Sequence, residues 1–111
     1  MNRLLDKKFY LREKRVQRIY EIDDELYEFL REASKIYKAT ISDIFNACIK
    51  ELLESNNLQI YQSKKDILFP AHSFDVNESN VKGLGNLKKE TTYNMNVLVS
   101  MAIRNVMEME Y

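Results

Sequence analysis

This chain of 111 residues is poor in the residues that make disulfides, loops and membrane spans. It has one cysteine, one proline and two glycines. A single cysteine excludes a disulfide framework and a cysteine-based zinc site. Scarce glycine and proline exclude collagen-like and loop-dominated folds. No apolar run approaches the ~20 residues of a membrane span, and no signal-peptide pattern opens the chain. We therefore expect a soluble cytoplasmic protein with no membrane partner.

What is present suits one compact domain. Apolar residues make up 45% of the chain and aromatic residues 11%, which excludes a disordered protein. No glycine-rich phosphate loop occurs. His72 is the one histidine and has no cysteine or second histidine to share a metal, and Cys48 lies on an apolar helix face, as expected of a buried structural thiol. We expect no catalytic residue, no metal and no cofactor.

The formal net charge is zero, but the charges are unevenly distributed. Residues 1–18 hold seven basic and two acidic side chains, whereas residues 19–55 hold four basic and nine acidic ones. Aromatic and apolar residues interrupt the basic stretch at positions 9–11. Two interpretations are open. The residues could form a solvated helix or an arm that packs on the acidic segment, or they could form an arm that contacts nucleic-acid phosphates.

The first half of the chain has the pattern of a strand followed by two helices. Residues 16–22 alternate β-forming and polar side chains, which predicts a strand. Asp23 is a typical helix cap, and apolar residues then recur at helical spacing as far as Lys38. A second amphipathic helix begins at Thr40 or Ser42, both of which are good caps.

The second half has the same order of elements, after a connector of residues 56–70. Beyond Pro70, which cannot donate to a strand ladder, alternating residues again predict a strand. Residues 77–79 can cap a third helix, residues 91–94 form a break, and a fourth amphipathic helix continues towards the C-terminus.

An ungapped offset of 54 residues aligns the two halves. It places residues 40–54 over residues 94–108, with caps and apolar positions kept in type, and it aligns Tyr20 with Phe74. Amphipathic helices align easily by chance, but here a strand and two pairs of caps match at the same offset. The sequence therefore predicts a duplicated strand–helix–helix unit. The alternative is a small helical domain whose repeat is accidental.

Since one strand cannot satisfy its own backbone groups, two such units must pair their strands. Residues 18–53, RIYEIDDELYEFLREASKIYKATISDIFNACIKELL, resemble the ribbon–helix–helix (Arc/MetJ-type) family of DNA-binding proteins. The shared pattern is an alternating strand, an acidic helix start, leucines at helical spacing, and a Ser-acid-apolar-apolar opening to the second helix. Residues 71–108 resemble the family more loosely. The family is normally homodimeric, and the repeat suggests that both units lie in one chain, as in tandem relaxosome accessory proteins of conjugative plasmids.

The resemblance implies a mostly α fold in which two ribbon–helix–helix units form an intramolecular pseudo-dimer around a two-stranded antiparallel ribbon. We expect a basic N-terminal arm over residues 1–15, a first unit over 16–55, a connector over 56–70 and a second unit over 71–111. Residues 16–111 would then fold as one domain.

In this family the ribbon lies in the DNA major groove, and the N-termini of the second helices face phosphates. Carried over to this chain, the base-contacting residues are Gln17, Ile19, Glu21, Ser73 and Asp75. The phosphate-contacting residues are Lys7, Lys8, Arg12, Lys14, Arg15, Arg18, Thr40, Ser42, Asn94 and Asn96.

The implied function is that of a non-enzymatic DNA-binding protein: a transcriptional regulator, an antitoxin-like repressor, or an accessory factor of a plasmid or mobile element. Its partner would be double-stranded DNA, with a second copy of the chain or another protein as further candidates. Glu21 and Asp75, however, place carboxylates where the family usually has basic or neutral polar residues. They favour the alternative of a ribbon–helix–helix-like protein-interaction module that does not bind DNA.

Two further departures concern glycine. The turns between paired helices, at residues 38–39 and 92–93, lack the glycine that the family usually has there. Gly83 and Gly85 instead fall inside the predicted third helix, at a cost of about 0.5–1 kcal/mol each. They predict an irregular helix at that point.

Overall fold

The computed structural model describes residues 13–58 and 69–110. Over these residues the protein is mostly helical, with four helices and one two-stranded antiparallel sheet, as the sequence predicts. The elements in chain order are β1 (Arg15–Glu21), α2 (Asp24–Tyr37), α3 (Ile41–Ser55), β2 (Ala71–Asn77), α4 (Glu78–Thr91) and α5 (Met95–Glu110).

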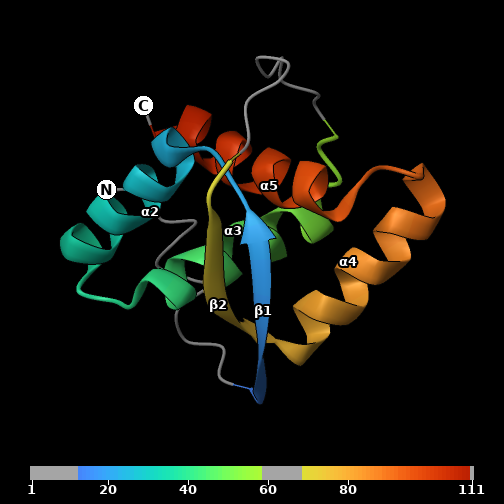
Figure 1. Cartoon of the computed structure of the whole chain (residues 1–111), viewed down its shortest axis with the longest axis horizontal. Coiled ribbons are helices and arrows are strands. Elements are labelled where there is room, and N and C mark those ends of the chain that lie inside the picture. The colour runs from blue at the N-terminus through green and yellow to red at the C-terminus, as the bar shows by residue number, and fades with distance from the viewer. Residues whose placement is uncertain (1–12, 59–68, 111) are drawn as a thin grey trace.

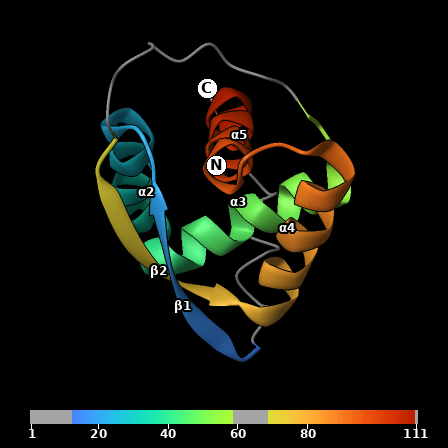
Figure 2. The same cartoon turned by 45° about the vertical axis from the view of Figure 1, so that its right-hand side comes forward.

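The two strands form a ribbon in front of the helices, with α2 on one side and α4 on the other (Figures 1 and 2). Arg15 pairs with Asn77 at one end of the ribbon and Glu21 with Ala71 at the other. Strand residues alternate between the two faces, so Tyr20, Phe74 and Val76 point to the core. The alternate positions form the outer face, which includes Gln17, Ile19 and Glu21 on β1 and Ala71, Ser73 and Asp75 on β2.

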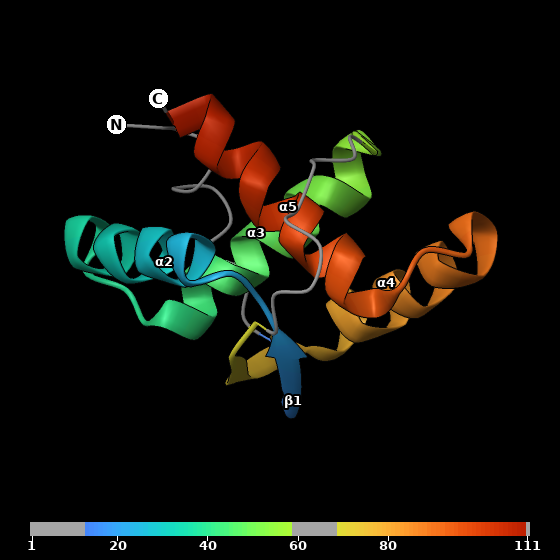
Figure 3. The ribbon, with the colours of Figure 1, turned by 45° about the horizontal axis from the view of Figure 1, so that its top comes forward.

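Helices α3 and α5 cross in the middle of the molecule and carry most of the core (Figure 3). Phe45 of α3 is the central contact with the ribbon, because its ring stacks on Phe74 with centroids 4.1 Å apart and on Tyr20 at 5.6 Å. Burial raises the pKa of the Tyr20 phenol. Cys48 is fully buried on the same helix, as expected of a structural thiol.

The helix boundaries follow the local chemistry of the sequence. The Asp23 side chain caps α2 by accepting from the Glu25 N–H at 3.0 Å. Each helix pair is then joined through a residue in the left-handed region: Lys38 after α2 with φ 54° and Thr92 after α4 with φ 62°. Lys38 and Thr92 take the left-handed conformation that glycine usually takes at this position. A residue with a side chain adopts this conformation less favourably than glycine does.

The expected irregularity at the two glycines is wrong, because α4 is continuous from Glu78 to Thr91. Gly83 has a packing reason: a Cβ there would collide with the side chain of Leu53 on α3. The missing side chain lets the two helices approach closely. Gly85 faces open space, since nothing lies within 4 Å of where its Cβ would be.

Candidate nucleic-acid interface

The outer face of the ribbon is exposed from the Gln17–Asp75 pair to the Glu21–Ala71 pair. All five residues predicted to contact bases lie on it: Gln17, Ile19, Glu21, Ser73 and Asp75. Ile19 is 68% exposed and lies opposite Ser73 on the neighbouring strand. The Gln17 amide donates a 2.7 Å hydrogen bond to the Ser73 hydroxyl across the strands, so the two neutral polar side chains are held together.

The N-termini of α3 and α5 each hold one strand of the ribbon. The Ser42 hydroxyl accepts from the Asp75 N–H on β2 at 3.0 Å. The Asn96 side-chain oxygen accepts from the Glu21 N–H on β1 at 3.1 Å. Each second helix thus supports the strand of the other half of the chain. This crossing of contacts interlocks the two halves and places both helix N-termini beside the ribbon.

Arg15 is engaged within the protein. Its guanidinium contacts the Asp43 carboxylate at 2.8 Å, and its Nε donates to the Asn77 side-chain oxygen, also at 2.8 Å. Burial alone would raise the pKa of Asp43, but hydrogen bonds from the Thr40 N–H and from Arg15 outweigh it and hold that pKa below its ordinary value. Arg15 therefore belongs to the scaffold of this site, where we predicted a phosphate contact.

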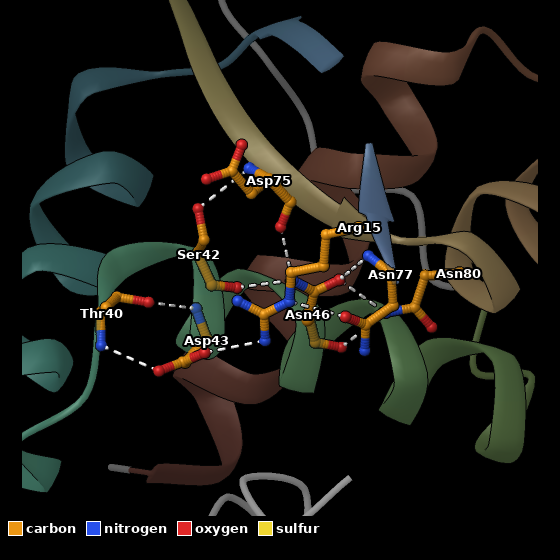
Figure 4. A network of polar contacts seen from close by, with 8 residues as sticks. All are labelled: Arg15, Thr40, Ser42, Asp43, Asn46, Asp75, Asn77 and Asn80. Atoms are coloured by element: carbon orange, nitrogen blue, oxygen red, sulfur yellow. Dashed lines mark hydrogen bonds and ion pairs between the residues drawn. The ribbon is translucent and has the colours of Figure 1, made fainter. Parts of the chain in front are cut away.

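Three buried asparagines continue this network beneath the ribbon (Figure 4). The Asn46 amide of α3 donates to the Asp75 carbonyl at 2.8 Å, and its oxygen accepts from the Asn77 N–H at 2.7 Å. Asn80 of α4 donates to the Asn46 oxygen at 3.0 Å. One side chain therefore joins α3, the end of β2 and the start of α4. The roles of Asn46 and Asn80 were not predicted, because the one signal that the sequence offers for each is a polar residue inside an apolar helical stripe.

The residues just before β1 cap α4 from the far half of the chain. Because Asn77 binds Arg15, its side chain makes no cap to α4. The Glu13 carboxylate accepts from the Ser79 N–H at 2.8 Å instead, and the Lys14 carbonyl accepts from the Glu78 N–H at 3.0 Å. The hydrogen bonds from Ser79 lower the pKa of Glu13. The Lys14 side chain is exposed and lies 3.8 Å from the Glu78 carboxylate.

The two second helices differ at their N-termini. Thr40 and Asp43 form a capping box at α3, in which each side chain accepts from the other residue's backbone N–H. At α5 the Asn94 side chain accepts from the Asn96 N–H at 2.8 Å, and the first turn holds no acid. The first turn of α3 thus carries a carboxylate, whereas the first turn of α5 carries none.

The other predicted phosphate contacts divide into two groups. Arg18 is exposed on β1 and donates to the Gln17 carbonyl at 2.9 Å. Lys7, Lys8 and Arg12 lie outside the described residues. The exposed cations at the ribbon are therefore Arg18 on β1 and Lys14 just before it.

Within the described ranges, no group of three or more histidine, cysteine, aspartate or glutamate residues could hold a metal ion. No helix in this part of the chain is long and apolar enough to span a bilayer. Comparison with family models, with curated proteins and with solved structures gives no match.

Proposed function

We propose that this chain binds double-stranded DNA by placing the outer face of the β1–β2 ribbon in the major groove. The observation that carries this is the ribbon itself, which is exposed on one face and packed on helices on the other. A major groove about 12 Å wide admits a two-stranded ribbon. Helix N-termini flank the ribbon at both ends, where phosphates would lie.

The proposal includes a tandem duplication of residues 15–55 and 71–110. Helices α2 and α4 begin and end 54 residues apart, and α3 and α5 begin at the same offset. The left-handed residues Lys38 and Thr92 keep that offset as well. The ribbon register pairs Ile19 with Ser73, which are equivalent at 54 residues. A pair of homologous units related by a two-fold axis would have this register.

Salt dependence of binding to random duplex DNA tests the proposal. Each phosphate contact that is lost should reduce the slope of log K against log salt by about 1. We expect the Lys14→Ala/Arg18→Ala variant to have a slope lower by about 2. Lys88→Ala/Lys89→Ala, at the C-terminal end of α4 away from the ribbon, removes the same charge and should leave the slope unchanged. Equal slopes for both variants, or no binding at low salt, would refute DNA binding by the ribbon.

The two outer-face carboxylates favour a second candidate, a protein-interaction module with the same fold. Glu21 and Asp75 would repel phosphates on either side of a groove, whereas an interaction module would use them for a basic partner. Glu21→Gln/Asp75→Asn should tighten binding to random duplex DNA if the ribbon enters the groove. Unchanged DNA binding would favour the interaction module. A role as regulator, antitoxin-like repressor or mobile-element accessory factor belongs to the DNA-binding proposal.

A further inference from the structure

Resting on the proposed function, we infer that this chain recognises a DNA site without two-fold symmetry and binds it in one orientation. The ribbon has two distinguishable ends. The Arg15 end carries Arg15 paired with Asn77, and the Glu21 end carries Glu21 paired with Ala71. The outward neutral side chains and the helix N-termini differ between these ends, whereas the two outward carboxylates, Glu21 and Asp75, are equivalent.

The first difference lies in the side chains that would face the bases. A two-fold axis between the paired residues Ile19 and Ser73 would exchange these two with each other and Gln17 with Ala71. Glutamine can pair with an adenine edge, whereas alanine offers only contact with a thymine methyl. Ile19 and Ser73 would also contact bases differently, because isoleucine offers an apolar surface and serine offers a hydrogen-bonding hydroxyl. Two half-sites with identical sequences would therefore not be read equally.

The second difference lies in the groups that would face phosphates. The N-terminus of α3 lies at the Arg15 end, where Ser42 holds β2, and its first turn carries Asp43. The N-terminus of α5 lies at the Glu21 end, where Asn96 holds β1, and its first turn carries no acid. The exposed cation Lys14 lies at the Arg15 end. An exposed cation therefore lies at one flank, and a helix N-terminus without an acid in its first turn lies at the other.

The chain supplies a matched pair of positions to test the orientation. Asp24 and Glu78 are the first residues of α2 and α4, 54 residues apart, and both are exposed. Asp24 lies beyond the Glu21 end of the ribbon and Glu78 beyond the Arg15 end. Neither is a proposed DNA contact, although the Glu78 carboxylate lies 3.8 Å from the Lys14 ammonium. In a Cys48→Ala background, Asp24→Cys and Glu78→Cys each provide one attachment point for an iron chelate that cuts nearby DNA.

The experiment begins by selecting sites from a random duplex library with the full chain. We expect a consensus without two-fold symmetry. On that consensus, the Asp24→Cys and Glu78→Cys chelates should cut opposite flanks. The two cuts should be separated by about six base pairs or more, because the seven paired positions of the ribbon, at ~3.4 Å a residue, are as long as about six base pairs of DNA. A palindromic consensus, or two-flank cutting by each chelate, would overturn the single orientation and leave DNA binding intact. Failure to select any duplex at low salt would overturn the proposed function as well.

Discussion

The two strand–helix–helix segments, residues 15–55 and 71–110, share a backbone plan but stabilise it differently. Both have a first helix that ends in a left-handed residue and a second helix whose N-terminus holds the opposite strand. Around α3, however, Asp43 and Asn46 join Arg15, Asn77 and Asn80 in a polar network. The residues of α5 at the same offset are Val97 and Ser100.

The contrast teaches that one arrangement of elements can be specified by two kinds of contact. Asn80 is buried on α4, and the residue 54 positions earlier is Leu26, which is buried in the core. Apolar burial stabilises wherever shapes fit, whereas a hydrogen-bonded amide stabilises only when each of its partners is in place. The network around α3 therefore depends on more partners being in place. We expect single substitutions there to lower the free energy of unfolding more than the matched substitutions around α5.

The largest effect should come from Asn46→Ala. This change removes the partners of the buried Asn77 N–H and of the Asp75 carbonyl, and it leaves the Asn80 amide only the Asn46 backbone carbonyl as acceptor. We expect a loss of about 3 kcal/mol in the free energy of unfolding, because unsatisfied buried groups each cost about 1–3 kcal/mol. Urea denaturation measures it. Ser100→Ala, the matched change on α5, should stay within about 0.5 kcal/mol, and equal costs would contradict the proposed asymmetry.

Asp43→Asn should follow, with a loss of about 2 kcal/mol at pH 7, since it leaves the partly buried Arg15 without its carboxylate. The pKa of Asp43 is lowered in the folded protein from an ordinary value of 3.8. Its stabilisation is therefore complete above that value and is lost as the pH falls below it. Denaturation from pH 7 to pH 2 should show the two proteins converging in stability. A constant gap across that range would show that the charge of Asp43 is not responsible.

Ser42→Ala and Asn96→Ala compare the two interlocking contacts directly. Each change removes one side-chain acceptor from a strand N–H, at 3.0 and 3.1 Å respectively. We expect losses of about 1 kcal/mol from each, within 0.5 kcal/mol of one another. Chemical denaturation of both variants tests this. A cost on one side alone would mean that the interlock is not shared by the two halves.

The smallest effect should come from Gly85→Ala, which we expect to stabilise the protein by about 0.5–1 kcal/mol, because alanine is the better helix former and space is open there. Gly83→Ala should gain less or lose stability, because the new Cβ displaces the Leu53 side chain. Thermal unfolding of the two variants measures the difference. Equal gains would show that the close approach of α3 and α4 is not limited by this glycine.

Much of the local structure could be predicted from the sequence. The predicted strand over residues 16–22 is observed at 15–21, and Asp23 and Thr40 cap α2 and α3 as expected. The outward positions of Gln17, Ile19 and Glu21 followed from the alternation of the strand. The hydrogen-bond partners of Arg15 and Glu13 could not be predicted, because they are distant in the sequence. Arg15 and Asp43 are 28 positions apart, and Glu13 and Ser79 are 66 positions apart.

The sequence by itself determined the order, type and approximate limits of the elements in the described ranges, because periodicity and capping act within a few residues. Only the tertiary structure decided how polar groups were shared between the halves. In the folded protein Arg15 pairs with the Asp43 carboxylate, and Glu13 caps the N-terminus of α4. Gly83 is the point where α4 packs closely against Leu53 of α3. The physical reason is that each of these groups needs a partner, and the partner is chosen by which backbone atoms the fold brings within about 3 Å.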